Sequence, residues 1–311
     1  MYDVMCLGNI CADAIGRPID RIGEKGKITP VEQLELHTGG CATNSAIDLA
    51  KIGVKVAIAG KIGNDGFGSF IFNSLKAEGV NVAGLKMEDG IRTSASIILV
   101  GSDGERTILH SFGSNAVFTV EDIDLSFISK TKILFVAGSL LMPKFDGEPT
   151  ARVLKKAQEM GVYTVLDTAW DSTGRWMKAI GPCLPYLDLF IPSEDEAKML
   201  SNKEDPKEMA DVFLSMGAKL VVIKLGKKGC LIKNAKETIT VPAFEVEAVD
   251  ATGAGDSFVA GFITGLLKGW DLEQCGIFAN AVGAHCVMEM GASKGIKSFD
   301  EIMKFIQEHK R

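Results

Sequence analysis

Short apolar runs alternate with helical patterns along most of this chain, and this alternation restricts its fold more than any other feature. The runs have the length of buried strands, and they lie at residues 4–7, 56–60, 133–137, 164–167, 189–191 and 220–224. Apolar residues with helical spacing lie between them, at residues 65–78, 150–160, 194–200 and 206–216. Because strands that are joined through helices pair in parallel, we predict an α/β fold in which helices cover both faces of a central, mostly parallel sheet.

The rest of the chain consists of a closing segment and two interruptions. After the last predicted strand we expect a hairpin at 230–241 and three helices, at 253–268, 272–289 and 298–308. Residues 14–37 are polar and rich in turns, and residues 92–111 alternate around Asp103 and Gly104, which predicts a second hairpin. Both segments follow strands at the edge where open α/β sheets bind ligands. We therefore predict a small β lid made of 14–37 and 92–111 over an α/β core of 1–13, 38–91 and 112–311, with plain surface loops as the alternative.

Charge and cysteine usage exclude several classes of protein. The net charge is -6 and the basic residues are scattered, which argues against a nucleic-acid groove and against binding to an anionic membrane. The seven cysteines form no C-x-x-C pair, so we expect reduced thiols in a cytoplasmic protein. The first residues do not have the pattern of a signal peptide, and no apolar run approaches the length of a membrane span.

Residues 249–261, Val-Asp-Ala-Thr-Gly-Ala-Gly-Asp-Ser-Phe-Val-Ala-Gly, carry the strongest functional signal. Gly253, Ala254 and Gly255 allow a backbone to come close to a ligand, and an apolar run with helical spacing follows them. The N–H groups at the start of a helix bind anions, and Asp256 places a carboxylate beside that site. Such an arrangement suits a base that activates a hydroxyl while backbone amides hold the group under attack. A plain glycine turn with a capping aspartate is the alternative.

This stretch resembles the C-terminal signature of the PfkB or ribokinase-like family of sugar and nucleoside kinases. The resemblance implies a ribokinase-like fold with Asp256 as the catalytic base and an anion hole formed by Gly253, Ala254 and Gly255. It also implies ATP and Mg²⁺ as cofactors, allows a monovalent cation, and allows a homodimer formed through the lid. We assign Thr252, in the same stretch, to nucleotide binding.

Two further elements match the places where this family binds its acceptor. Gly39 and Gly40 open a helix, and Asn44, one turn into it, offers a donor and an acceptor to hydroxyl groups. Asp13 follows the first strand, where a carboxylate can accept hydrogen bonds from two neighbouring hydroxyls. Cys41 and Cys11 stand where many ribokinases have Lys and Asn, so the acceptor contacts differ from those of a typical ribokinase. A turn-forming role for Asp13 is the alternative.

Three elements match nucleotide and metal positions of the family. Lys224, Gly226 and Gly229 end a buried strand in a glycine turn, where the family carries its Gly-x-x-Gly nucleotide loop, often after Thr. Glu196 matches the family glutamate that organises Mg²⁺ through water, although Ser193 replaces the usual Asn and the pair also fits a simple capping box. Asn280 lies where family members place a polar residue beside the adenosine.

These observations favour an ATP-dependent kinase that phosphorylates a primary hydroxyl of a small sugar or sugar acid, of fructose, ribose or 2-keto-3-deoxygluconate type. A nucleoside kinase of the same family is the nearest alternative, and a non-catalytic sugar- or nucleotide-binding regulator is a more distant one. A dinucleotide-dependent oxidoreductase would need Gly-x-Gly-x-x-Gly after a strand, and a P-loop enzyme would need Gly-x4-Gly-Lys-Ser/Thr; the sequence contains neither.

Overall fold

The computed structural model describes residues 1–103 and 105–309, and a nine-stranded sheet forms its centre. The strand order is β13-β12-β11-β10-β9-β8-β1-β4-β5, and all neighbours are parallel except at β11–β12 and β12–β13. The predicted α/β fold with a mostly parallel sheet is therefore confirmed. The strands are β1 (Tyr2–Gly8), β4 (Val56–Gly63), β5 (Asn81–Glu88), β8 (Thr131–Ser139), β9 (Tyr163–Thr168), β10 (Leu189–Phe190), β11 (Leu220–Lys224), β12 (Cys230–Asn234) and β13 (Thr238–Val241).

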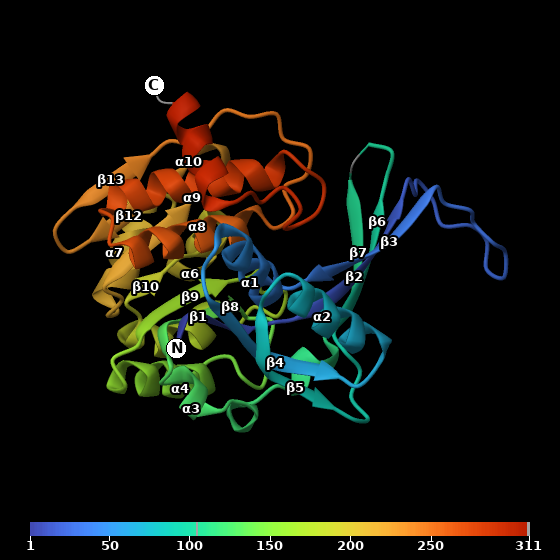
Figure 1. Ribbon diagram of the computed structural model, residues 1–311, viewed down its shortest axis with the longest axis horizontal. Helices are drawn as coiled ribbons and strands as arrows, with labels where there is room; N and C mark the ends of the chain where they lie inside the picture. The colour runs from blue at the N-terminus through green and yellow to red at the C-terminus, as the bar shows by residue number, and fades with distance from the viewer. Residues whose placement is uncertain (104, 310–311) are drawn as a thin grey trace.

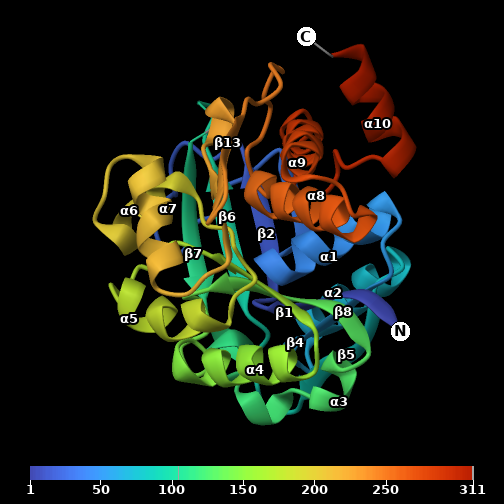
Figure 2. The same cartoon turned by 90° about the vertical axis from the view of Figure 1, so that its left-hand side faces the viewer.

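Helices cover both faces of this sheet, and each face has its own apolar core (Figure 2). Side chains alternate between the faces along each strand, so Val4 and Cys6 of β1 enter one core, while Met5 and Leu7 enter the other. The first core packs against α1 (Cys41–Ile52), α2 (Gly66–Ala77), α8 (Ala254–Lys268), α9 (Leu272–Val287) and α10 (Phe299–Glu308). The second packs against α3 (Leu125–Ile128), α4 (Glu148–Glu159), α5 (Trp176–Ile180), α6 (Glu194–Ser201) and α7 (Pro206–Ser215).

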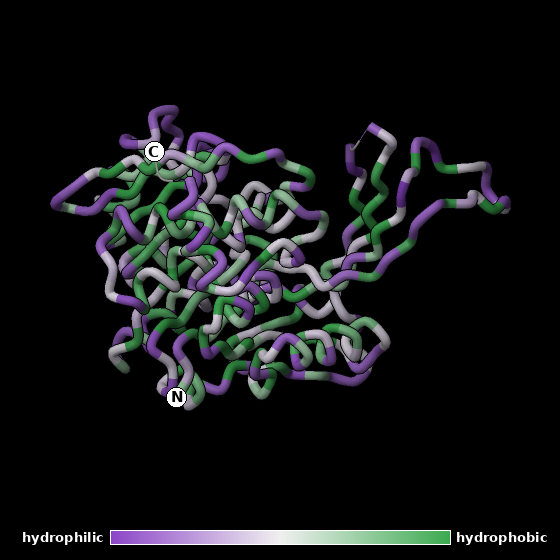
Figure 3. The backbone as a smooth tube through the Cα atoms, turned by 45° about the horizontal axis from the view of Figure 1, so that its top comes forward, coloured by the Kyte–Doolittle hydropathy of each residue, from purple (hydrophilic) through white to green (hydrophobic). Residues whose placement is uncertain are grey.

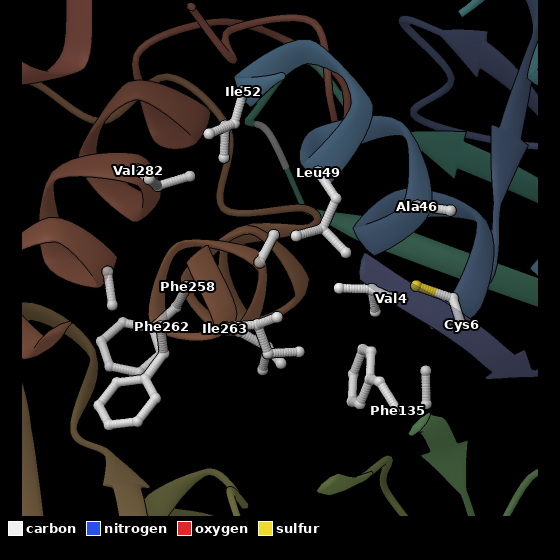
Figure 4. Close-up of a cluster of buried hydrophobic side chains, with 14 of the residues drawn as sticks. Val4, Cys6, Ala46, Leu49, Ile52, Phe135, Phe258, Phe262, Ile263 and Val282 are labelled. Atoms are coloured by element: carbon white, nitrogen blue, oxygen red, sulfur yellow. The ribbon is translucent and has the colours of Figure 1, made fainter. Parts of the chain in front are cut away.

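The first core fixes α1 and α8, whose first turns carry predicted site residues. Figure 4 shows Leu49 of α1 and Ile263 of α8 with Val4 of β1 and Phe135 of β8, and all four side chains are fully buried. Close packing of this kind leaves little freedom for the helices to shift against the sheet. The residues at the first turns of α1 and α8 are therefore held in fixed positions relative to the ends of the strands.

A second sheet stands away from the main body (Figure 1). Its order is β3-β2-β6-β7, with β2 and β6 parallel and the outer pairs antiparallel, from β2 (Cys11–Arg17), β3 (Gln33–Gly39), β6 (Ala95–Val100) and β7 (Arg106–Ser111). These strands come from the two segments that were predicted to form a lid, although β2 already begins at Cys11 and β3 extends to Gly39. Apolar stretches run along this sheet in Figure 3. We call it the lid sheet, and its function as a lid remains a prediction.

Several features of the sequence prediction differ from the structure or lie outside it. The edge strand β5 was not predicted, because its side chains are only partly buried and its residues form no continuous apolar run. Four short 3₁₀ helices, at Gly113–Val117, Val120–Asp122, Gly181–Tyr186 and Gly226–Lys228, were not predicted either. Strands β6 and β7 pair from Ala95 and Ser111 to Val100 and Arg106, as a hairpin requires. Gly104, the second residue of the predicted turn, lies outside the described residues.

Candidate active site

Two neighbouring cavities share a lining residue, and the larger one lies at the carboxyl ends of the parallel strands. The large cavity, about 620 Å³, is lined by groups that follow β9, β10 and β11 and by the start of α8. The small cavity, about 230 Å³, lies between the lid sheet and residues 249–252 and 290–292. Ala251 lines both cavities. This edge of an open α/β sheet is where such folds bind their ligands, so the two cavities together form the candidate site.

Glycine geometry shapes the turn between the two cavities. Gly253 caps α8 with φ 77°, and a Cβ at this position would lie 2.4 Å from the carbonyl oxygen of Ala292, so only glycine fits. Asp250 stabilises the turn: its Oδ1 accepts hydrogen bonds from the backbone N–H of Thr252 at 2.9 Å and from the Thr252 hydroxyl at 2.7 Å. Its Oδ2 accepts one from the N–H of Gly291 at 3.0 Å. The first N–H groups of α8 are thereby fixed at the wall of the large cavity, which Gly253, Ala254 and Gly255 all line.

Asp256 lies in the first turn of α8 and lines the same cavity. Its carboxylate accepts a hydrogen bond from Nδ2 of Asn44 at 2.8 Å, and its backbone oxygen accepts one from the hydroxyl of Ser45 at 3.2 Å. The residue is only 9% exposed. Burial raises the pKa of Asp256, and the bond from Asn44 and the charge of Lys224 counteract part of that shift. A desolvated carboxylate with a raised pKa, held in place beside helix N–H groups, has the properties of a general base.

Lys224 projects from the end of β11 into this cavity and contacts a residue that the sequence analysis did not assign to the site. Its Nζ lies 2.7 and 2.8 Å from the two carboxylate oxygens of Asp167, near the end of β9. Burial raises the pKa of Asp167 to about 7, although the charge of Lys224 acts to lower it. The sequence did contain a signal for this residue, since Asp167 ends a predicted buried strand at the edge where ligands bind.

Glu196, at the start of α6, lies on the same wall. Its Oε2 accepts hydrogen bonds from the Thr168 hydroxyl at 2.9 Å and from the backbone N–H of Ser193 at 3.0 Å. The second bond belongs to a capping box, so the capping role that the sequence left open is present. Glu196 nevertheless lines the cavity, and its carboxylate is available there for a hydrated cation.

The remaining nucleotide candidates lie along the large cavity. Gly226 and Gly229 line it, and Gly229 adopts φ 97° with β13 so close that a Cβ would lie 1.9 Å from the Val241 oxygen. Asn280 of α9 lines it too, with Nδ2 donating to the backbone oxygens of Val241 and Pro242 at 3.2 and 3.1 Å. Phe244, Val246 and Val287 give this end an apolar wall, which suits a planar base.

Thr252 lies apart from this group. It lines the small cavity, and its hydroxyl is engaged by Asp250 and by Arg106 of the lid sheet. Among the described residues, its side chain contacts neither Gly226 nor Gly229, although the sequence analysis assigned it to nucleotide binding as well. Its backbone nevertheless leads directly into the glycine turn at the start of α8.

The acceptor candidates gather around the small cavity and the start of α1. Asp13 lines this cavity, and Gly39 lies so close to it that a Cβ there would be 2.0 Å from Asp13 Oδ2. Gly40 caps α1 with φ 88°. Asn44, on the same helix, donates to Asp256, and its buried Oδ1 has no partner among the described residues. The structure therefore brings Asp13, Gly39, Gly40 and Asn44 together on the approach to Asp256.

Arg17 and Arg106 also line the small cavity, and the sequence analysis did not assign them to the site. Arg106 contacts the Thr252 hydroxyl and lies 3.6 Å from Asp250, while Arg17 contacts Gln33 and Met290. Side chains along each of these strands point alternately to the two faces of the lid sheet. The pairing of β2, β3, β6 and β7 places both arginines on the face toward the small cavity, and the sequence alone does not show this pairing.

The described residues contain no group of three or more His, Cys, Asp and Glu side chains arranged to hold a metal ion. In the part of the chain that the structure describes, no helix has the length and apolarity needed to cross a bilayer.

A family model described as pfkB family carbohydrate kinase matches residues 1–298. An ATP-dependent 6-phosphofructokinase from Thermoanaerobacterium thermosaccharolyticum is 29% identical over 311 residues, which cover 97% of this chain and 92% of the relative. A ribokinase from Staphylococcus aureus is 30% identical over 307 residues, which cover 96% and 98%. The solved structure of a ribokinase from Arabidopsis thaliana, complexed with ribose and ATP, has a TM-score of 0.85 at 23% identity and covers 98% of this chain and 99% of its own.

Proposed function

The chain belongs to the pfkB family of carbohydrate kinases, and from that premise we propose that it transfers a phosphoryl group from ATP to a primary hydroxyl of a small sugar or sugar acid, of fructose, ribose or 2-keto-3-deoxygluconate type. One observation carries the proposal. The buried carboxylate of Asp256 lies beside the glycine turn at the start of α8, with the nucleotide-sized cavity on one side and the Asp13 cavity close by.

The nucleotide occupies the large cavity in this proposal. Its base packs on the apolar wall at Phe244, Val246 and Val287, and its phosphates extend past the loop at 226–229 toward the start of α8. The N–H groups of Gly253, Ala254 and Gly255 donate hydrogen bonds to the oxygens of the phosphoryl group during its transfer. These donors stabilise the negative charge that spreads over those oxygens. Lys224 adds a full positive charge at the same wall.

Asp256 removes the proton from the acceptor hydroxyl. The hydroxyl oxygen forms a bond to the γ-phosphorus while the bond from that phosphorus to the bridging oxygen breaks, and ADP leaves. The proton passes to Asp256 late in this transfer, because the transition state is loose and the oxygen becomes acidic only as its new bond forms. The hydrogen bond from Asn44 fixes the direction of the Asp256 carboxylate, and Asp13 orients the acceptor through its other hydroxyls.

The residues present fit a hydrated Mg²⁺. Among the described residues, the hydrogen bonds to the Glu196 side chain both go to Oε2, which leaves Oε1 for the water shell of a cation. Mg²⁺ prefers oxygen ligands and usually takes one or two carboxylates with phosphates and waters, so no cluster of protein ligands is needed. When it is bound, Mg²⁺ neutralises charge on the phosphates. A monovalent cation is proposed only as an activator, to be tested by exchanging K⁺ for tetramethylammonium.

The acceptor side supports a small ligand that carries no phosphate group. A volume of about 230 Å³ is below the range of about 300–1,000 Å³ that drug-sized ligands need, which favours a sugar over a nucleoside. Arg17 and Arg106 are both engaged by neighbouring groups, and Asp13, Glu35 and Asp250 bring negative charge to the same cavity. An unphosphorylated acceptor therefore fits better than a sugar phosphate.

We also propose that two copies of the chain pair through the outer face of the lid sheet. Residues whose side chains point away from the small cavity are apolar and exposed there: Leu34 (73%), Leu36 (40%), Ile97 (51%) and Leu109 (55%). Neighbouring apolar side chains on an exposed sheet face are typical of an interface. Light scattering on Leu34→Asp/Leu109→Asp beside wild type tests this: a dimer that becomes a monomer supports it, and an unchanged mass contradicts it.

A cytoplasmic location is part of the proposal, because all seven cysteines are free thiols and ATP is the phosphoryl donor. The function itself is tested by measuring ATP consumption with Mg²⁺ over panels of ketoses, hexoses, pentoses, keto-deoxy acids and nucleosides. We expect turnover with at least one sugar or sugar acid. Turnover with nucleosides alone would show that the acceptor is a nucleoside and not a sugar. No turnover with any acceptor, together with intact nucleotide binding, would favour a non-catalytic regulator.

A further inference from the structure

The ion pair between Lys224 and Asp167 is almost fully buried, and its contribution to folding stability does not explain why it is there. The two side chains are 11% and 2% exposed, and the ammonium lies 2.7 and 2.8 Å from the two carboxylate oxygens. Burying two charges costs desolvation energy that their attraction often fails to recover, so a buried ion pair is weak support for a folded state. Both residues line the large cavity, so a role in binding a ligand there explains the ion pair better.

The position of the ammonium is informative. If Gly255 carried a Cβ, that atom would lie 3.5 Å from Lys224 Nζ, so the ammonium lies directly over the first turn of α8. Asp256 is the next residue of that turn. Lys224 thus faces the place where the proposed anion hole holds the phosphoryl group, rather than the glycine loop of its own strand.

Several carboxylates surround the Lys224 ammonium, and without a fixed partner it could bind any of them. Asp167, Glu196 and Asp256 all line the cavity around it, and a lysine side chain is flexible enough to reach any of them. An ammonium has three N–H donors. Asp167 accepts from Nζ with both oxygens, which fixes the direction of the ammonium and leaves one donor over the first turn of α8.

We propose that Asp167 is a positioning residue that holds Lys224 against the start of α8, where the free N–H of the ammonium binds an oxygen of the γ-phosphoryl group. This inference rests on the proposed function, because it assumes that ATP occupies the large cavity. It assigns to Asp167 no contact with substrate: the residue acts through Lys224. The contact distinguishes a triphosphate from a diphosphate, since ADP has no γ-phosphoryl group to receive it.

The ratio of two affinities tests this without an identified acceptor. Isothermal titration calorimetry measures the Kd of Mg-ADP and of the Mg complex of the non-hydrolysable β,γ-imido analogue of ATP. We expect wild type to bind the triphosphate analogue more tightly than ADP. Lys224→Met should lower that preference about tenfold, the usual effect of losing a hydrogen bond to a charged group. Asp167→Asn should lower it severalfold, and the double variant no further than Lys224→Met alone, because Asp167 acts through Lys224.

Charge and position make opposite predictions for Asp167. Removal of a negative charge strengthens the binding of any anion, so a pure charge effect tightens both nucleotides and leaves their ratio unchanged or higher. Asp167→Glu keeps the charge but moves the carboxylate by one methylene, so it should also lower the ratio if position matters. It also serves as the second variant if Asp167→Asn does not fold.

Asp146→Asn is the matched control. Asp146 is a second buried carboxylate, with 1% of its side chain exposed, and it pairs with Arg175 at 3.0 Å away from the cavity lining. Its loss should affect stability and leave the ratio at the wild-type value. A ratio that stays at the wild-type value in both Asp167 variants overturns this inference alone, whereas a wild type that binds neither nucleotide overturns the proposed function together with it.

Discussion

The proposed phosphate end of the site is built from buried groups at the carboxyl edge of the nine-stranded sheet, whereas the proposed acceptor end depends on half-exposed side chains of the lid sheet. Asp256 and Asp167 are 9% and 2% exposed, while the Arg106 and Glu35 side chains are 40% and 52% exposed. The first set is fixed between packed helices and strand ends. The second set stands on a sheet that projects from the body (Figure 1).

This difference separates two tasks. Chemistry needs groups whose positions vary by little, and close packing around α1 and α8 supplies that. Acceptor choice needs a surface that can differ between related proteins without disturbing the chemistry, and an exposed sheet supplies that. We therefore expect changes in the core to affect turnover and stability, and changes in the lid sheet to affect acceptor preference.

The largest effect is expected in the core, at the base. Asp256→Asn keeps the shape and the hydrogen bond from Asn44 but cannot accept the proton, so kcat should fall about a hundredfold to ten-thousandfold. Steady-state kinetics with the best acceptor measures this, and thermal unfolding checks that the variant is folded. Turnover within tenfold of wild type in a folded variant would remove Asp256 from the role of base.

The next effect concerns the acceptor end. We expect fructose, or whichever acceptor the screen selects, to have a higher kcat/KM than its phosphorylated counterpart, because both arginines of the small cavity are engaged and three carboxylates line it. The 6-phosphofructokinase relative makes this comparison worthwhile. A kcat/KM at least tenfold higher for the phosphorylated sugar would show that Arg17 and Arg106 turn toward the ligand.

A smaller effect is expected behind the base, at Asp48. This carboxyl on α1 is fully buried, its Oδ2 accepts a hydrogen bond from Ser257 at 2.6 Å, and burial raises its pKa to about 8. A raised carboxyl pKa means that the folded state binds a proton that the unfolded state releases. Its contribution to stability is therefore complete below about pH 4 and is lost as the pH rises through about 8.

Asp48→Asn cannot titrate, so the stability of wild type relative to this variant should fall by roughly 1 kcal/mol per pH unit between about pH 5 and 8. Urea unfolding of both proteins at each pH unit measures the difference. Stability curves that run parallel over this range would show that Asp48 does not titrate as its burial implies.

The smallest effect is expected in the lid segments. If they close over the acceptor and exclude water, saturating acceptor should slow amide hydrogen exchange in 14–37 and 92–111, while buried strands such as β8 exchange as slowly as before. Mass spectrometry of peptic fragments resolves these regions. Equal exchange in both lid segments with and without acceptor would contradict the closure.

The sequence predicted most of the core and much of the site, for identifiable reasons. Buried strands such as β8 have apolar residues on both faces, so they read as continuous runs, whereas the partly buried edge strand β5 does not. The turn at Gly253 was predictable because glycine is required at its positive φ. Burial of a strand and a positive φ both constrain residues that are neighbours in the sequence, so each can be predicted from a single segment.

Contacts between distant segments could not be predicted in the same way. Asp167 and Lys224 lie 57 positions apart and meet because only one strand, β10, lies between β9 and β11 in the sheet order. Thr252 shows the reverse case: its chain neighbours belong to the glycine turn at the start of α8, but its hydroxyl donates to Asp250 at the small cavity. Strand order decides the contact of Asp167 with Lys224, and side-chain direction decides the contact of Thr252 with Asp250. A local sequence motif predicts neither contact.

Phosphorus NMR of the reaction mixture tests the central claim most directly. With Mg-ATP and the acceptor selected by the screen, we predict that wild type produces a phosphate monoester of the acceptor in equal amount to ADP, and that Asp256→Asn produces neither at a comparable rate. ADP that accumulates with inorganic phosphate and no monoester would show that water, and not a sugar hydroxyl, receives the phosphoryl group, which would contradict the proposed function.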